Sequence, residues 1–346
     1  MGSLNVLMDC PLWAEGYEIQ RTTLFDFRRR CVDTLRDECG VGPMNEATLA
    51  PERNLFSTLF ITTSLALGVS APKARFYAMA NQCIRALVTG CDNLLDDEFK
   101  EVIQFDFSGS GTRFRSVLTV MVADRVLSDM AADELAAGRF SRKQAKRLTR
   151  AVLGLLLPSG IEEHEEESDT DGRVPSPDEM LTEVHQRKTG LLFQAPIALL
   201  ETMGELAPDQ TEPAMETLRN LGLACQALDD MKDIVPDLRR RRYNLVLSLA
   251  YHGDVPHERE LVASCLQEGP RALETTRRAA AELKEAGSRC GAIADDLFRE
   301  AEAGLMRLIP RFGRNQAGAL SSAIACAIQK GQRDLRRQPT CRGARR

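Results

Sequence analysis

One stretch of the sequence decides the fold: LGLACQALDDMKDIVPDL, which occupies residues 221–238. Apolar residues run from Leu221 to Leu228, and acidic residues follow within the same helical pattern. Asp229 and Asp233 are four positions apart, so a helix places both carboxylates on one face. Acids within an apolar helix are costly unless they are paired or bound to a metal. The stretch therefore predicts a helix that carries a divalent-metal site.

A second acidic stretch, DNLLDDE at residues 92–98, has the same spacing near the end of a predicted helix over 73–100. Asp92 and Asp96 share a helix face, where two like charges repel unless a cation lies between them. Mg²⁺ takes oxygen ligands and is commonly shared between carboxylates and substrate phosphates. We expect the two acidic helices to face each other across a cavity, with several Mg²⁺ ions that neutralise a diphosphate.

Basic residues near both acidic stretches complete the predicted site. Lys188 and Arg242 lie on either side of the stretch at 221–238, and Arg113 and Arg115 follow the stretch at 92–98. One guanidinium group binds two phosphate oxygens at once, and lysine supplies a point charge. Each of these residues alone is more often a surface residue. Their positions around both acidic stretches favour a role in phosphate binding.

The remaining sequence favours a helical protein. Apolar residues make up 43% of the 346 residues and aromatic residues only 5%, a balance typical of packed helices. Strand-like alternation is scarce. We predict one domain over residues 1–336 and a basic, flexible tail over 337–346. The acidic segment 161–178 contains two prolines, and its like charges predict a mobile loop near the mouth of the site.

Composition also argues against several classes of protein. A net charge of −5 lacks the basic footprint of a nucleic-acid-binding protein. Residues 54–72 carry no charge but include several polar residues, so a buried helix is favoured over stable membrane insertion. The ten cysteines form no close CxxC pair, which indicates free thiols in a reducing compartment. Without a signal-peptide pattern in the first twenty residues, we expect a cytoplasmic protein.

These motifs resemble those of the trans-isoprenyl diphosphate synthases and their class I terpene synthase relatives, from about residue 50 to residue 255. Those families carry DDxxD on one helix and FQxxDDxxD on another; here residues 92–96 read DNLLD and residues 225–233 read CQALDDMKD. The family's Lys-Thr pair is matched by Lys188-Thr189. The resemblance implies an all-α bundle of the isoprenoid synthase type with a central apolar cavity, three Mg²⁺ ions and a homodimer.

The resemblance also implies roles for individual residues. The implied metal ligands are Asp92, Asp96, Asp229, Asp230 and Asp233. The implied contacts to the substrate diphosphate are Lys188, Gln226 and Arg242, with Arg113, Arg115 and Arg53 as further candidates. The catalytic set is Asp92, Asp96, Asp229, Asp230 and Lys188. Asn93 is expected to be a weak ligand or a neighbour of the ligands. Leu87 and Val88, just before the first motif, are expected to set the depth of the pocket.

One departure from the family bears on the reaction. Chain-elongating synthases carry Gly-Lys-Arg-x-Arg-Pro to bind isopentenyl diphosphate, whereas this chain has Glu52 at the lysine, keeps Arg53, and has Leu55 at the second arginine. We therefore favour a class I terpene synthase of isoprenoid biosynthesis, a carbon–oxygen lyase. It would ionise a C15 or C20 prenyl diphosphate, cyclise it and release pyrophosphate. Isopentenyl diphosphate is then not expected to be a substrate.

Two alternatives stay open. The first is a trans-prenyltransferase that condenses an allylic diphosphate with isopentenyl diphosphate to make farnesyl, geranylgeranyl or polyprenyl diphosphate. The Asp-rich second motif favours it, because most cyclases of this fold resemble one another at an Asn/Ser/Glu triad there. The second alternative is a noncatalytic partner subunit of such a synthase, against which the intact second motif and Lys188 argue.

Overall fold

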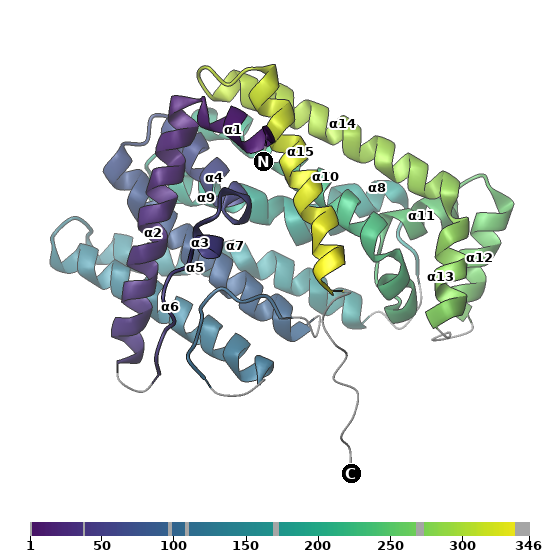
Figure 1. Ribbon diagram of the computed structural model, residues 1–346, viewed down its shortest axis with the longest axis horizontal. Helices are drawn as coiled ribbons and strands as arrows, with labels where there is room; N and C mark the ends of the chain where they lie inside the picture. The colour runs from purple at the N-terminus through teal and green to yellow at the C-terminus, as the bar shows by residue number, and fades with distance from the viewer. Residues whose placement is uncertain are drawn as a thin grey trace, which may run out of the picture. The chain divides into compact units, whose positions relative to one another are not determined.

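The computed structural model describes residues 2–36, 39–95, 99–107, 111–168, 173–267 and 273–335. These residues form helices and no β-strand; an isolated antiparallel bridge joins Val41 and Phe105. The predicted all-α class is confirmed. In chain order (Figure 1), the helices are α1 (Gly2–Met8), α2 (Pro11–Leu35), α3 (Glu46–Leu49), η1 (Pro51–Arg53), α4 (Leu55–Ala66), α5 (Ala71–Leu95), α6 (Thr112–Ala136), α7 (Arg142–Ser168), α8 (Pro177–Glu179), η2 (Met180–Val184), η3 (Gln186–Gly190), α9 (Leu191–Met203), α10 (Pro208–Arg240), α11 (Leu245–His252), α12 (Pro256–Gln267), α13 (Leu273–Glu282), α14 (Lys284–Leu308) and α15 (Arg314–Leu335).

The chain divides into two compact units. The first comprises Met1–Pro158, Gln194–Glu216 and Leu305–Gln316, and the second comprises Ser159–Phe193, Thr217–Gly304 and Ala317–Arg346. The expectation of one domain over residues 1–336 stays a prediction, and the predicted tail over 337–346 lies outside the described residues.

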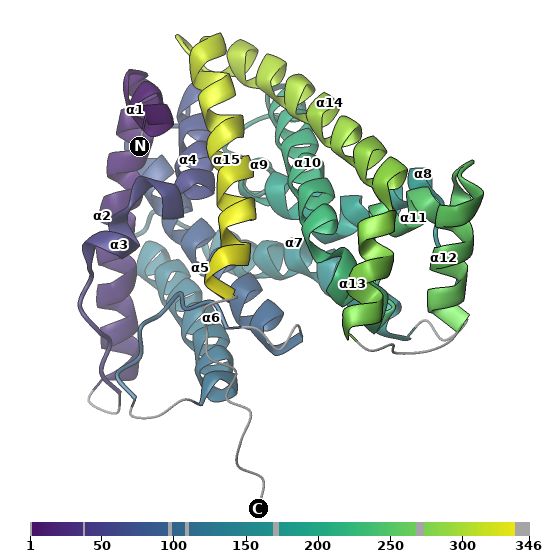
Figure 2. The same ribbon diagram turned by 45° about the vertical axis from the view of Figure 1, so that its right-hand side comes forward.

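Helices α2, α4, α5 and α6 form the core of the first unit. Helix α2 packs against α4 and α5, and α5 packs against α6, as both ribbon views show (Figures 1 and 2). The close approach of α5 and α6 depends on Gly90. A Cβ atom there would come within 2.7 Å of the Val120 side chain and 3.1 Å of the Ser116 carbonyl oxygen. Gly90 thereby fixes the part of α5 that carries Asp92.

The second unit has its own apolar core. Helix α11 packs against α8, η2 and α12, and α12 packs against α13. Helix α10 contributes Ala227 and Leu238 to this core, where they join Met180, Leu245 and Cys290. The apolar part of the stretch at 221–238 is therefore buried, as its pattern predicts.

The predicted mobile loop over 161–178 is wrong in its first half. Helix α7 continues through Pro158 and ends only at Ser168, and both Glu162 and Glu166 are buried. Neighbouring cations remove the repulsion that suggested a loop, since Arg187 contacts Glu162 and Lys188 contacts Glu166. Residues 169–172 lie outside the described residues.

The uncharged stretch 54–72 forms a core helix. Helix α4 buries Leu59, Ile61 and Thr62 in the first unit. In the described part of the chain, no helix is long and apolar enough to cross a membrane.

Candidate active site

Four charged side chains form a closed cluster in the second unit. Lys188 Nζ lies 2.9 Å from Glu163 Oε1 and 2.9 Å from Glu166 Oε2. Arg242 Nη1 lies 2.7 Å from Glu163 Oε2 and 3.0 Å from Glu166 Oε2. Helix α7 supplies both carboxylates, η3 supplies Lys188, and Arg242 follows α10. The structure thus brings together two of the cations that the sequence assigned to a diphosphate, and pairs them with two acids that the sequence placed in a loop.

The glutamates keep both cations charged. Burial alone would lower the pKa of Lys188, but the carboxylates of Glu166 and Glu163 raise it above its usual value. The same competition raises the pKa of Arg242. Glu166 is the better-anchored acid, because its Oε1 also accepts a hydrogen bond of 2.5 Å from the backbone N–H of Tyr243.

A hydrogen-bonded chain joins the Lys188-Thr189 motif to α10. Thr189 Oγ1 donates to Gln226 Oε1 at 2.5 Å, and Gln226 Nε2 donates to Asp230 Oδ1 at 2.9 Å. Asp230 Oδ2 accepts from the backbone N–H of Leu245 at 2.6 Å and lies 3.0 Å from His185 Nε2. Asp230 is buried, and each of its carboxylate oxygens has a protein partner. In this geometry the side chains of Gln226 and Asp230 hold the Lys188-Thr189 motif in position.

Asp229 and Asp233 form an outward-facing pair on α10. Their side chains are 45% and 33% exposed, and Lys232 Nζ lies 2.9 Å from Asp229 Oδ1 and 3.3 Å from Asp233 Oδ2. Two carboxylates that converge on one cation suit Mg²⁺, which is often bound through one or two carboxylates plus substrate phosphates. Across the described ranges, no group of three or more His, Cys, Asp and Glu residues is arranged to hold a metal ion.

Asn244 connects the end of the stretch at 221–238 to α11 through hydrogen bonds. Its Oδ1 accepts from the backbone N–H groups of Val246 and Leu247 and caps α11. Its Nδ2 donates to the carbonyl oxygen of Asp230 and to Asp237 Oδ2, both at 2.8 Å. Burial raises the pKa of Asp237 to about 8. The hydrogen bond from Asn244 lowers this pKa, whereas the nearby charges of Asp230 and Asp233 raise it further.

The first acidic motif lies in the first unit, at the end of α5. Asn93 is buried there; its Nδ2 donates to the carbonyl oxygen of Lys100 at 3.0 Å, and its Oδ1 accepts from the Lys100 N–H at 2.8 Å. Asp92 is exposed, and Asp96 lies outside the described residues. The predicted helix over 73–100 ends at Leu95. That the two acidic motifs face each other stays a prediction.

The other predicted residues of the first unit have varied environments. Arg115 Nη2 donates to the Phe107 carbonyl oxygen at 2.8 Å, and its Nη1 lies 3.3 Å from Glu101 Oε1. Arg113 is exposed. Leu87 and Val88 are half-buried on α5, and their role in pocket depth stays a prediction.

Sequence reasoning missed one cation, Arg85. Arg85 Nη2 lies 3.3 Å from the carbonyl oxygen of Arg53, and its Nη1 lies 3.5 Å from Asn54 Oδ1. Burial and the charge of Arg53 lower the pKa of Arg85. Within the described residues, no ion pair with a carboxylate is recorded for either arginine. Arg85 is 32 positions from Arg53 in the chain, so no local pattern connects them. The structure therefore places two arginines where the sequence suggested one.

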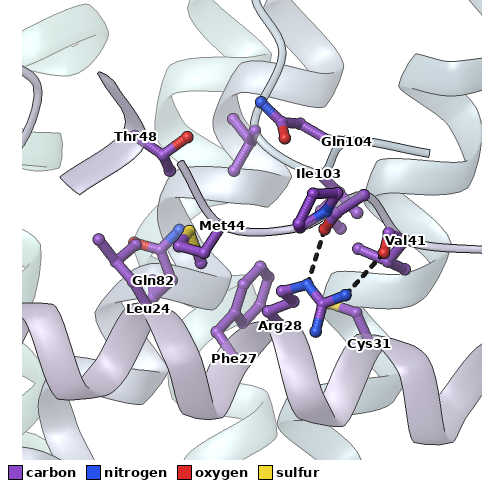
Figure 3. Close-up of a pocket in the computed structure, with 13 residues that line it drawn as sticks. Leu24, Phe27, Arg28, Cys31, Val41, Met44, Thr48, Gln82, Ile103 and Gln104 are labelled. Carbon is purple, nitrogen blue, oxygen red and sulfur yellow. Dashed lines mark hydrogen bonds between the residues drawn. The ribbon is translucent and has the colours of Figure 1, made fainter. Parts of the chain in front are cut away.

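A small cavity in the first unit is not the candidate active site. Figure 3 shows this cavity of about 40 Å³ between α2, with Leu24 and Phe27, and the segment 41–44. Arg28 closes one side, because its Nε and Nη2 donate to the carbonyl oxygens of Gly42 and Val41 at 2.7 and 2.8 Å. The volume suits roughly one or two water molecules, and none of the predicted site residues lines it.

Several solved structures share the fold of this chain. The chain is similar to the geranylgeranyl pyrophosphate synthetase from Pyrococcus horikoshii, with a TM-score of 0.63, 16% identity, and coverage of 92% of this chain and 98% of that one. It is similar to a polyprenyl synthase from Caulobacter crescentus, complexed with calcium and isoprenyl diphosphate, with a TM-score of 0.62, 19% identity, and coverage of 91% and 97%. It is also similar to the geranylgeranyl pyrophosphate synthetase from Geoglobus acetivorans, with a TM-score of 0.59, 15% identity, and coverage of 90% of this chain and 99% of that one.

A family match agrees with the fold. Residues 148–282 match the model of the Polyprenyl synthetase family, a range that includes the charged cluster and the whole second motif. Members of that family are prenyltransferases and depend in general on Mg²⁺. The expected resemblance to trans-isoprenyl diphosphate synthases and the expectation of an enzyme are confirmed. A search of curated proteins found no match.

The comparisons change the order of the functional hypotheses. The prenyltransferase, which the sequence analysis kept as an alternative, is better supported than the terpene synthase it favoured, and cyclisation is not confirmed.

Proposed function

We propose that this chain is a Mg²⁺-dependent trans-prenyltransferase that condenses an allylic prenyl diphosphate with isopentenyl diphosphate. The observation that carries the proposal is the charged cluster of the second unit, in which Lys188 and Arg242 share two carboxylates. The Asp229–Asp233 pair lies on α10 of the same unit. A Polyprenyl synthetase match over the same residues supports it.

Different residues of the chain have different roles in this reaction. Lys188 and Arg242 would hold the oxygens of the allylic diphosphate, and Asp229 and Asp233 would hold Mg²⁺. Asp92 and Asp96 are proposed as further metal ligands, with three ions in all. Mg²⁺ supplies Lewis-acid stabilisation of the leaving pyrophosphate. The carbon–oxygen bond of the allylic substrate breaks, the double bond of isopentenyl diphosphate attacks the resulting cation, and a proton is lost.

The arginine pair of the first unit supports the condensation. A second diphosphate held without metal ions needs fixed cations. Arg53 alone would be a weak site, but Arg85 adds a second guanidinium, whose Nη2 lies 3.3 Å from the Arg53 carbonyl oxygen. Arg85→Gln should therefore raise KM for isopentenyl diphosphate at least about tenfold, since a charge-assisted hydrogen bond contributes roughly 1.5–3 kcal/mol. Its KM for the allylic substrate should stay near the wild-type value.

A terpene synthase remains the second candidate because of Glu52. This exposed carboxylate lies next to Arg53 and opposes the binding of a second diphosphate. Pyrophosphate release separates the two candidates. We expect release when a C10, C15 or C20 allylic diphosphate and isopentenyl diphosphate are both present with Mg²⁺. Release from an allylic diphosphate alone would favour the terpene synthase.

The Asp229–Asp233 pair provides the control for metal dependence. Asp229→Ala should remove nearly all release and keep the fold, because the Asp229 side chain is 45% exposed and an exposed ion pair contributes little to stability. Normal turnover of Asp229→Ala, or of the wild type in chelator, would contradict the role of the metal.

We also propose a homodimer. Phe114, Val117 and Met121 lie on one face of α6 and are 61%, 40% and 61% exposed. An apolar row of this kind often marks an interface. The proposed location is the cytoplasm, which the cysteines support: those that the structure describes are free, and six of them are buried.

A further inference from the structure

The charged cluster of the second unit is electrically balanced. Glu163 and Glu166 together match the charges of Lys188 and Arg242, and each carboxylate contacts both cations. A diphosphate that binds the same nitrogen atoms must therefore compete with a carboxylate that already holds them. Fixed acids in such a position weaken the attraction of the cations for any anion.

The two glutamates are not equivalent. The side chain of Glu166 is 1% exposed and contacts Lys188, Arg242 and the backbone N–H of Tyr243, so its removal would break three contacts of a buried carboxylate. The side chain of Glu163 is 18% exposed, and among the described residues its ion pairs are with the two cations. Glu163 can leave the cluster at a smaller cost, because water reaches it and rotation of one side chain is sufficient.

We propose that Glu163 is an internal competitor for the substrate diphosphate, whereas Glu166 is a positioning residue that stays with Lys188 and Arg242. This inference rests on the proposed function of the site. Because a ligand must displace the Glu163 carboxylate, the site favours ligands with a high negative charge. A diphosphate offers both cations more negative charge than Glu163 does, and a monophosphate offers less than a diphosphate. Glu163 thereby sets both the affinity of the site and its preference for diphosphate.

Calorimetric titration of the full chain with inorganic pyrophosphate in MgCl₂ tests the proposal. Glu163→Gln keeps the size of the side chain and removes its charge, so pyrophosphate should bind roughly tenfold more tightly than to the wild type. Inorganic phosphate should gain less, and the ratio of the two dissociation constants should change. Glu163→Ala should show the same direction.

Glu165→Gln is the matched control. Glu165 lies on the same helix, carries the same charge and contacts Arg187 at 3.3 Å, but does not contact Lys188 or Arg242. Its affinity for pyrophosphate should stay within about twofold of the wild type, as for an exposed ion pair. Circular dichroism confirms that each variant is folded. Lys188→Gln should weaken binding with either residue at position 163.

The outcomes separate this inference from the proposed function. Wild-type protein that binds pyrophosphate, with Glu163→Gln and Glu163→Ala no tighter than Glu165→Gln, would overturn the inference and leave the proposed function intact. A wild type and variants that all fail to bind pyrophosphate in Mg²⁺ would overturn both.

Discussion

Amide and carboxylate side chains have different uses in this protein. Asn93 is an amide because it both donates to and accepts from the backbone of Lys100, which a carboxylate cannot do. Asp230 is a carboxylate that accepts from Gln226 and Leu245. Asp229 and Asp233 are the proposed metal ligands. Burial and hydrogen-bond partners, rather than residue type, thus separate the positions that shape the site from those that are proposed to bind.

Asn93→Asp restores the DDxxD sequence of the family but should harm this chain. The new carboxylate has no donor for the Lys100 carbonyl oxygen and places a charge where Asn93 is buried. We expect a loss of roughly 1–3 kcal/mol in the free energy of unfolding, measured by urea denaturation. The control is Asp92→Asn, at an exposed position, which should be close to wild type in stability. An Asn93→Asp protein that is as stable as the wild type would contradict the structural role of Asn93.

Asp237 makes stability depend on pH. Its pKa is about 8 in the folded protein and about 3.9 in an unfolded chain, so the folded state binds more protons between these values. The free energy of unfolding of the metal-free protein should therefore fall as pH rises from about 4 to about 8. Asp237→Asn keeps an acceptor for Asn244 and should flatten this dependence. Melting temperatures in chelator across this pH range provide the measurement, and parallel curves for wild type and variant would refute the assignment.

At the scale of helices, the sequence predicted much of the structure and failed where charges are paired over long distances. The apolar run at 221–228 and the acid spacing within 229–233 identified α10 because both signals are local. The end of α7 was missed because Glu163 and Glu166 are stabilised by Lys188 and Arg242, which lie 22 to 79 positions further along the chain. A local rule sees only the repulsion among neighbouring acids. Arg85 escaped notice for the same reason.

The exposed row on α6 leads to a prediction about assembly. Met121→Glu places a charge in the centre of the proposed interface, so the variant should be monomeric at concentrations where the wild type is a dimer. Size-exclusion chromatography with light scattering measures the mass directly. Phe25→Glu on α2, where an exposed phenylalanine is changed in the same way, is the control and should remain dimeric. A dimeric Met121→Glu variant would place the interface elsewhere.

At the scale of the whole molecule, the fold follows from patterns along the whole sequence, whereas the reaction depends on a few residues. Helical periodicity sufficed to predict an all-α fold, and the resemblance of two acidic motifs to those of the isoprenyl diphosphate synthases implied the type of bundle. The choice between elongation and cyclisation depends on a few cations whose neighbours come from distant parts of the chain. Counting the cations at residues 51–56 left Arg53 alone and favoured cyclisation, whereas the structure adds Arg85 beside it.

Incorporation of isotopically labelled isopentenyl diphosphate tests the central claim most directly. Wild-type protein in Mg²⁺ is incubated with geranyl, farnesyl or geranylgeranyl diphosphate and the labelled substrate, and the products are separated by chain length. We predict labelled prenyl diphosphates at least one five-carbon unit longer than the allylic substrate, with little product from Asp229→Ala. An unlabelled hydrocarbon or terpene alcohol, formed equally well without isopentenyl diphosphate, would contradict the claim.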